Sequence, residues 1–579
     1  MRNHPSSPLP HTLLLTLLTL LILALFSRGL TDPDTGWPDA DRVLMDGLFI
    51  HDFLRDLNLS TLLDRDFFSN AYQYAIRYFA QYPALSLGSR PPFFPGIEAI
   101  FFFVFGIHDH SAKLALLLFV LIGLWAWHDL VRRTHDRTTA LMASGLLFTT
   151  PFIVQWGWYP MLEIPVLAMT ILTANLLWRH QENGAPKWLY LAAVAFSLAL
   201  WTKQTALFMA PWFAAWLIVT GQARRLLKTR ATWLALGMMA VLTAPLAALT
   251  IWMGKTNLAL AFQGMEAAHQ NADWTQWAYL RQYLDLLIQY QVTYPVLALA
   301  ALGVVTTLVR RDRHALFYLL LIVTTYLFFT ALHSFRIDRY TIFWVPGFAL
   351  LAALPFHHFR EHPLVRRFGW LVVVGIMIMH IHQVQTQTPA YTQGHREAAI
   401  LALQHSKQGR IFMDGINNGY FTYYVRLNDP DRRFHVLRGD KLLHSSSVFT
   451  EHWTQIHIRD LQGIHALFDQ YGIDIIVVEG FNYAGLEIHQ ILRDYLETDA
   501  FELLKEIPIR STRSRLSDQV LKVYRYKHPQ PPTNRRISLS VPLVGKTFET
   551  TLPDTPAPQT PKRDSDLRTS HGSLTSPPE

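Results

Sequence analysis

Long apolar runs separated by short polar breaks fill the first two thirds of the chain. A helix needs about 20 mostly apolar residues to cross the hydrocarbon core of a bilayer. We predict eleven membrane spans, and because several runs are short, some helices must be broken or end inside the protein. The runs occupy residues 11–30, 112–131, 137–155, 160–178, 187–202, 205–220, 231–252, 293–309, 315–332, 340–356 and 368–384.

One further apolar stretch, residues 91–107, begins with three prolines and contains Glu98. If this stretch lies along the membrane interface, every Arg-rich loop between spans falls on the cytoplasmic side, as the positive-inside rule requires. If it crosses, all the later basic loops are exported. We therefore predict an interfacial helix here, with the N-terminus in the cytoplasm and the C-terminal region outside.

Three larger segments then lie on the outer face. Residues 31–110 are rich in Asp and predict interfacial helices. In residues 253–292, Trp and Leu recur at helical spacing, which predicts an amphipathic helix on the membrane. In residues 385–528, the apolar runs 411–415, 434–437 and 473–479 predict buried strands that alternate with helices, typical of a small α/β domain.

Composition supports this division into domains. The chain has 579 residues, of which 50% are hydrophobic and only 16% charged, which is too apolar for an ordinary soluble protein. The net charge of +8 comes from basic residues in short loops, so it indicates membrane topology rather than nucleic-acid binding. The absence of Cys excludes disulfides and thiol chemistry. We expect residues 1–384 to form the membrane domain, and residues 529–579, rich in Pro, Ser and Thr, to form a disordered tail.

Charged residues from distant parts of the chain fall at span ends on the same predicted outer face. Ionisable groups gathered in this way indicate a functional site. The candidates are Asp39, Asp41, Arg90, Glu163, Lys203, Arg336 and Arg339.

The order of the motifs resembles that of the polytopic GT-C glycosyltransferases, in particular the dolichyl-phosphate-mannose protein mannosyltransferase superfamily and the bacterial lipid A aminoarabinose transferases. The resemblance covers residues 10–385. It rests on an acidic motif after the first span (PDADR, 38–42), a basic-Pro-Pro stretch (SRPPFFP, 89–95), WYPMLEIP, ALWTKQ and Arg339-Tyr340. It implies the α-helical GT-C fold and sugar transfer from a polyprenyl phosphate at the outer face.

Such a transfer passes through an oxocarbenium-like state and needs a carboxylate that takes the acceptor's proton. The resemblance assigns catalysis to Asp39, Asp41 and Glu163, with Asp39 favoured as the base because Asp-x-x-Arg matches the family pattern, although Val43 replaces the family's usual aromatic residue. The leaving phosphate needs cations. We assign this role to Lys203, Arg90 and Arg339, which stand in the motifs that carry the resemblance, and to Arg336, a further cation on the same predicted face.

Each of these residues also has a structural alternative. Asp39 and Asp41 could cap a helix, Glu163 could cap its span, and the cations could extend along the apolar surface to reach the interface. We expect no required metal ion, since Ser89 stands where some relatives have Glu and His269 is isolated. A divalent metal ion stays an open alternative.

The sequence therefore predicts a glycosyltransferase of a bacterial cytoplasmic (inner) membrane that uses a polyprenyl-phosphate sugar. Its acceptor would be a lipid, a glycan or a protein, and membrane lipid but no nucleic acid would be a partner. A transporter or flippase of lipid-linked sugars is the alternative. Transporters place their sites near the bilayer midplane on repeated, broken helices, whereas these charges lie at one rim. A non-catalytic scaffold with the same fold is a third hypothesis.

Overall fold

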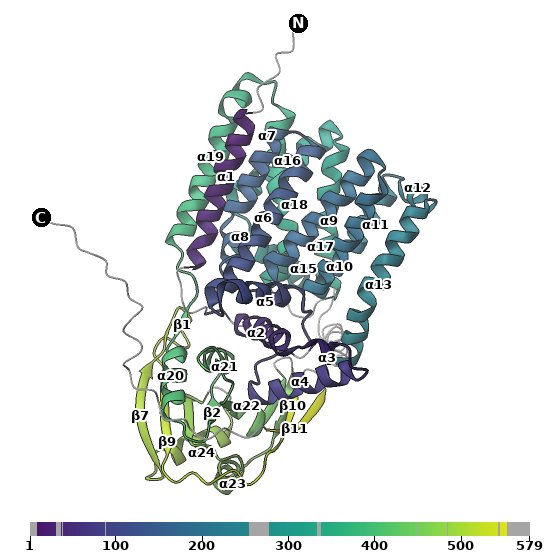
Figure 1. The fold of residues 1–579 in the computed structure, drawn as a ribbon. Coiled ribbons are helices and arrows are strands. Elements are labelled where there is room, and N and C mark those ends of the chain that lie inside the picture. Colours follow the sequence, from purple (N-terminus) through teal and green to yellow (C-terminus); the bar gives the residue numbers. More distant parts are fainter. Residues whose placement is uncertain are drawn as a thin grey trace, which may run out of the picture.

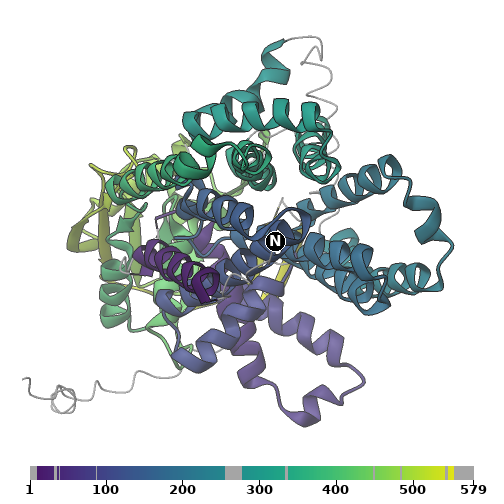
Figure 2. The same ribbon diagram turned by 90° about the horizontal axis from the view of Figure 1, so that it is seen from above.

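The computed structural model describes residues 9–30, 36–37, 39–86, 88–253, 277–332, 337–447, 450–482, 485–541 and 545–552. Figure 1 shows a bundle of long helices, an α/β domain, and a layer of shorter helices between them. Helix α1 (Leu9–Ser27) begins at the end of the bundle that is far from the α/β domain. In Figure 2, seen from above, this N-terminal end is in front and strands of the α/β domain lie behind.

Helices occupy all eleven predicted positions. They are α1 (Leu9–Ser27), α6 (Asp109–Thr134), α7 (Arg137–Thr149) followed by α8 (Pro151–Trp156), α9 (Glu163–Asn183), α10 (Pro186–Thr202), η2 (Gln204–Phe208) followed by α11 (Met209–Val219), α13 (Arg230–Met253), α16 (Tyr294–Arg310), α17 (Arg313–Leu332), η4 (Asp338–Trp344) followed by α18 (Val345–His358), and α19 (Pro363–Thr386). Within the described residues, six helices are long and apolar enough to cross a membrane. The chain is thus a multi-pass helical membrane protein, while the number of eleven crossings stays a prediction.

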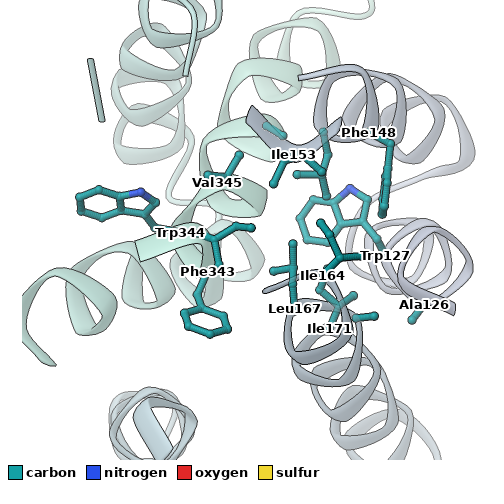
Figure 3. Packing of buried hydrophobic residues seen from close by; sticks show 14 of the residues in the cluster. Ala126, Trp127, Phe148, Ile153, Ile164, Leu167, Ile171, Phe343, Trp344 and Val345 are labelled. Atoms are coloured by element: carbon teal, nitrogen blue, oxygen red, sulfur yellow. The ribbon is translucent and has the colours of Figure 1, made fainter. Parts of the chain in front are cut away.

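The core of the bundle is formed by α6, α7, α9 and α18. Figure 3 shows Trp127 of α6 among apolar side chains of α7, α8 and α9, with Phe343 to Val345 on the facing segment. Trp127 is 1% exposed. A close helix crossing lies at Gly303 of α16, where a Cβ atom would be 1.9 Å from the carbonyl oxygen of Leu351 in α18. Small residues allow such close backbone approach between membrane helices.

The layer between bundle and α/β domain comes from the predicted outer segment. It contains α2 (Ala40–Asp56), α3 (Leu59–Leu62), α4 (Phe67–Gln81) and α5 (Phe93–Phe105). Helix α5 runs across the end of the bundle, as an interfacial helix would (Figure 1). The basic helix α12 (Ala223–Leu227) lies at the opposite end (Figure 1). The described parts of the predicted outer segments therefore share one end of the molecule, and which end faces the cytoplasm stays a prediction.

Part of the second outer segment lies outside the described residues, which resume at Trp277. From there α15 (Trp277–Leu286) continues into the π-helical turn η3 (Leu287–Gln291). Tyr283 and Leu287 are buried against the bundle, so the described half of the predicted amphipathic helix places an apolar face on protein.

The C-terminal domain has a mixed five-stranded sheet in the order β3-β2-β6-β9-β7. Strand β2 pairs in parallel with β3 and β6, while β9 pairs antiparallel with β6 and β7. The strands are β2 (Arg410–Asp414), β3 (His435–Arg438), β6 (Ile475–Glu479), β7 (Phe501–Pro508) and β9 (Val520–Tyr526). The helices are α20 (His395–His405), α21 (Asn418–Leu427), α22 (Gly439–Leu442), α23 (Leu461–Tyr471) and α24 (Glu487–Leu496). Two short pairings, β1 (Thr392–Gln393) with β8 (Arg510–Ser511) and β4 (His444–Ser447) with β5 (Thr450–Ile456), lie outside the main sheet.

The boundary of the predicted disordered tail is wrong. Strands β10 (Arg536–Val541) and β11 (Lys546–Thr551) form an antiparallel hairpin inside it. Ile537, Leu539 and Phe548 are nearly fully buried, and the ring of Phe548 lies 6.1 Å from that of Phe79 in α4. Apolar residues alternate along both strands and favour this pairing. The prediction missed them because it was based on the average composition of residues 529–579, which is rich in Pro, Ser and Thr. Residues 553–579 lie outside the described part of the chain.

Candidate functional site

Five of the predicted site residues form one chain of ion pairs where the bundle meets the outer layer. Arg90 Nη2 lies 2.9 Å from Asp39 Oδ1, and Arg339 Nη2 lies 3.2 Å from Asp39 Oδ2. Arg339 Nε also lies 3.8 Å from Glu163 Oε1, which Lys203 Nζ contacts at 2.8 Å. The order is Lys203–Glu163–Arg339–Asp39–Arg90, so cations and carboxylates alternate.

Each of the five side chains stands at a point where an element begins or ends. Glu163 is the first residue of α9, and Lys203 follows the last residue of α10. Arg339 lies in the 3₁₀ turn η4, and Arg90 just precedes the Pro-Pro pair before α5. Because the helices they belong to are packed side by side, their ends bring these charges together at one level.

Asp39 precedes α2 and has a left-handed backbone, with φ 76° and ψ −18°. Asp adopts this conformation more readily than most residues that carry a Cβ. Arg90 Nη1 donates to the carbonyl oxygen of Asp39 at 3.1 Å, in addition to pairing with its carboxylate. The Asp39 side chain makes no capping hydrogen bond to α2, so it stays directed at the two arginines.

The charges of the cluster favour an ionised Asp39 and an anionic ligand. Burial opposes ionisation, but the guanidinium groups of Arg90 and Arg339 hold the pKa of Asp39 well below its usual range. Three cations against two carboxylates leave one positive charge in excess. Asp39, at 33% side-chain exposure, is the most accessible of the five.

Glu163 is the most enclosed member, with its side chain 1% exposed. Its Oε2 atom has no hydrogen-bond partner within the described part of the chain. The ring of Tyr340 lies beside the cations, 5.2 Å from Lys203 Nζ and 5.8 Å from Arg339 Cζ, at cation–π distance. Tyr340 was part of the sequence motif but was not predicted as a site residue.

The structure does not bring Asp41 into this chain of ion pairs. Its carboxylate accepts the backbone N–H of Arg42 at 2.8 Å and packs against Gly419 of the C-terminal domain. Asp41 is 8% exposed, and burial raises the pKa of its carboxyl. Arg336 lies outside the described residues.

An apolar cavity of about 210 Å³ lies beside Arg90, between α2, α4 and the end of α13. Most of its wall is apolar, including Phe49, Tyr72 and Trp252. Asp46 contributes a carboxylate that accepts the backbone N–H of Ser86 at 2.9 Å, and burial raises the pKa of Asp46 to about 6. The sequence analysis missed Asp46, although it stands only seven residues after Asp39 in the same Asp-rich segment.

Among the described residues, no three His, Asp or Glu side chains are grouped as a metal ion would need. His269, one of the residues considered for metal binding, lies outside this part of the chain. His380 is buried between two hydroxyls, Thr149 Oγ1 at 3.1 Å and Thr293 Oγ1 at 2.8 Å, which satisfy both ring nitrogens.

Comparison with known families gives a match over part of the chain. Residues 89–251 match the model of the family described as dolichyl-phosphate-mannose-protein mannosyltransferase. The predicted family resemblance is confirmed. The matched segment includes Arg90, Glu163 and Lys203, three members of the charged chain. A search of curated proteins finds no match to this sequence.

Solved structures of the same fold extend the similarity to most of the chain. ArnT from Cupriavidus metallidurans in the apo state has a TM-score of 0.55 and 13% identity, covering 88% of this chain and 97% of ArnT. ArnT bound to undecaprenyl phosphate also has a TM-score of 0.55, with 14% identity and the same coverage. The apo oligosaccharyltransferase from Archaeoglobus fulgidus has a TM-score of 0.53 and 10% identity, covering 81% and 70% of the two chains. The chain therefore has the ArnT-like fold.

Proposed function

We propose that this protein is a membrane glycosyltransferase that moves a sugar from a polyprenyl phosphate to an acceptor at the outer face of a bacterial cytoplasmic membrane. The observation that carries the proposal is the ion-pair chain from Lys203 to Arg90. It offers an accessible carboxylate flanked by cations at the end of a membrane bundle. The N-terminus would be cytoplasmic and the C-terminal domain extracytoplasmic.

The donor would bind through its phosphate and its lipid chain. Arg90, Arg339 and Lys203 supply charge-assisted hydrogen bonds, and Arg side chains bind phosphate oxygens in bidentate fashion. The apolar cavity beside Arg90 would take the part of the isoprenoid chain next to the phosphate. The family match, and the ArnT structure bound to undecaprenyl phosphate, support a polyprenyl-phosphate donor.

The reaction would need one proton transfer and one cleaved bond. The acceptor hydroxyl oxygen forms a bond to the anomeric carbon while its proton passes to the carboxylate of Asp39. The bond from the anomeric carbon to the phosphate oxygen breaks, and polyprenyl phosphate leaves with the bonding electrons. Arg90 and Arg339 stabilise the negative charge that develops on the phosphate.

Geometry favours Asp39 over Asp41 as the base. Asp39 is one-third exposed and faces the cations, whereas Asp41 is buried against the C-terminal domain. Glu163 would hold Lys203 and Arg339 in place through Oε1 and would offer Oε2 to the acceptor or to a bound water. A lipid, a glycan or a protein would supply the acceptor hydroxyl.

The test is a transfer assay that starts from what the protein binds. Mass spectrometry of lipids that copurify with the detergent-solubilised protein should detect a sugar-linked polyprenyl phosphate. That lipid, reconstituted with the protein and a membrane extract, should lose its sugar to an acceptor and release polyprenyl phosphate. Movement of the intact lipid across vesicles without release of polyprenyl phosphate would instead identify a flippase and overturn the proposal.

A further inference from the structure

The C-terminal domain is fastened to α2 along its helix α21. At one end, Arg426 makes a bidentate ion pair with Asp52, with Nε 2.8 Å from Oδ2 and Nη2 2.7 Å from Oδ1. Both side chains are buried, at 1% and 0% exposure. Tyr78 of α4 also donates to Asp52 Oδ2 at 2.8 Å. This end of the contact joins α2, α4 and α21 far from the charged site.

At its other end, α21 reaches the turn that carries Asp39. Gly419 packs on Asp41 so closely that a Cβ atom would lie 1.9 Å from Oδ2. The hydroxyl of the next residue, Tyr420, donates a hydrogen bond to the backbone carbonyl of Trp37. The two contacts lie on either side of Asp39 in the sequence. The domain therefore holds both flanks of this residue.

Trp37 is held from the bundle side as well. Its ring stacks on Tyr159 at 5.4 Å and meets Trp156 edge-on at 4.9 Å. Tyr159 Oη accepts the backbone N–H of Ala390 at 2.8 Å, in the linker to the C-terminal domain. Gly36 N donates to the carbonyl of the same Ala390 at 2.9 Å. Bundle, linker and α21 thus converge on the residue that stands two positions before Asp39.

The conformation of Asp39 explains why this support matters. A left-handed backbone at a residue with a Cβ is unfavourable and persists where surrounding contacts impose it. Without the contacts from α21, the turn would relax toward more common backbone angles and move the carboxylate away from Arg90 and Arg339. Small errors in the position of a reacting group lower reaction rates steeply.

We propose that the C-terminal domain positions the catalytic carboxylate, with Tyr420 as the positioning residue that holds the Trp37–Asp41 turn. This inference rests on the proposed function, since it gives the domain a role in the reaction of Asp39. It assigns that role to α21, with Tyr420 acting on Asp39 through the backbone of Trp37.

The test variant is Tyr420→Phe, which removes one hydroxyl and leaves the Arg426–Asp52 pair to dock the domain. We expect kcat to fall about fivefold to tenfold, the scale of one lost hydrogen bond, with an unchanged KM for the donor. The matched control is Tyr424→Phe on the same helix, whose hydroxyl faces Asp109 Oδ2 at 3.5 Å. This control should keep the wild-type kcat.

A second measurement does not depend on activity. Hydrogen exchange of the amides of residues 39–45 should be faster in Tyr420→Phe than in the wild type or Tyr424→Phe. Gly419→Ala, which forces Asp41 to shift, should give the same change from the other flank. In the Asp39→Asn background, Tyr420→Phe should not lower the transfer rate further, because the carboxylate that Tyr420 positions is already absent. A purely structural defect would instead lower the rate again.

Wild-type kcat and exchange in a folded Tyr420→Phe protein would overturn the inference. Equal losses in Tyr420→Phe and Tyr424→Phe would also overturn it, since the effect would then be general to the helix. If the wild-type protein shows no transfer at all, the proposed function fails. The exchange measurement then still decides whether Tyr420 holds the turn.

Discussion

The guanidinium group of Arg339 donates to the carboxylate of Asp39 at 3.2 Å, although the two residues lie 300 positions apart in the chain. The same guanidinium reaches Glu163 through Nε at 3.8 Å. Arg339 therefore connects the two carboxylates of the site. Removing it would leave Glu163 with Lys203 alone and Asp39 with Arg90 alone, so we expect its loss to affect both ends of the site.

Asp39→Asn keeps the shape of the side chain but cannot accept a proton. We expect a rate loss of about 10²–10⁴, as is usual when a general base is removed, with donor binding retained. Asp41→Asn is the matched control, because its carboxylate packs on Gly419 away from the arginines. Transfer rates of both purified variants decide the matter. An active Asp39→Asn with an inactive Asp41→Asn would reverse the assignment.

The pH dependence follows from the cations around Asp39. Arg90 and Arg339 overcome the effect of burial and keep the pKa of Asp39 below its usual value of about 3.9. The base is therefore ionised at neutral pH, and the acid limb of kcat/KM due to this group should lie below about pH 4. Arg90→Gln should move that limb to higher pH, because a cation that favours the carboxylate is lost. An unmoved limb would mean that another group sets it.

Lys203→Ala and Arg339→Ala should both weaken donor binding. A hydrogen bond to a charged group is worth about 1.5–3 kcal/mol, or about tenfold to a hundredfold in affinity. Because both cations contact Glu163 and would contact one phosphate, the double variant should lose less than the sum of the two losses. Lys203→Arg should keep part of the affinity. Binding of polyprenyl phosphate to folded, detergent-purified variants measures this, and an unaltered affinity in Lys203→Ala would remove that residue from the site.

The buried Asp52–Arg426 pair should dominate docking of the C-terminal domain. Arg426→Met leaves a buried carboxylate without its cation, which typically costs about 3–5 kcal/mol. We expect a lower unfolding temperature and faster proteolytic release of the domain. Arg55→Met is the control, since Arg55 is 40% exposed and its pair with Asp56 is 3.5 Å long. Equal stability of the two variants would contradict this view of the interface.

The same pair predicts an acid sensitivity of the interface. Burial opposes ionisation of Asp52, but His51 and Arg426 lower its pKa in the folded protein. A carboxyl whose folded pKa is depressed contributes stability above its unfolded pKa of about 3.9 and loses it as the pH falls further. Docking should therefore weaken below about pH 4 in the wild type. This part of the pH dependence should be absent in Asp52→Asn.

Topology can be tested cleanly because the chain contains no Cys. We expect Leu227→Cys, in the basic helix α12, to resist a membrane-impermeant thiol reagent in intact cells. Glu397→Cys, on α20 of the C-terminal domain, should react. Neither position is covered by protein, since Leu227 is 51% exposed and the side chain of Glu397 is 52% exposed. Labelling at position 227 but not at 397 would invert the predicted orientation.

Periodicity and length were reliable guides to the elements, because each depends on nearby residues. All the apolar runs that predicted spans are helical in the structure. The bounds of the predicted strands 411–415 and 473–479 differ by at most two residues from those of β2 and β6. The hairpin of β10 and β11 was missed, because its burial depends on α4, about 470 residues earlier in the chain. Asp41 was grouped with Asp39 because the two stand two positions apart in one motif, yet a backbone turn directs them to different partners.

By itself the sequence determined the membrane class, the positions of the helices, the α/β character of the C-terminal domain, and which charged residues lie at helix ends. These properties follow from local hydrophobic pattern and from matching motifs along the chain. Only the tertiary structure decided that Lys203, Glu163, Arg339, Asp39 and Arg90 form one chain of ion pairs, and that α21 holds the turn at Asp39. Those contacts join residues that are distant in the chain, and helix packing and domain docking fix their distances, which no local pattern encodes.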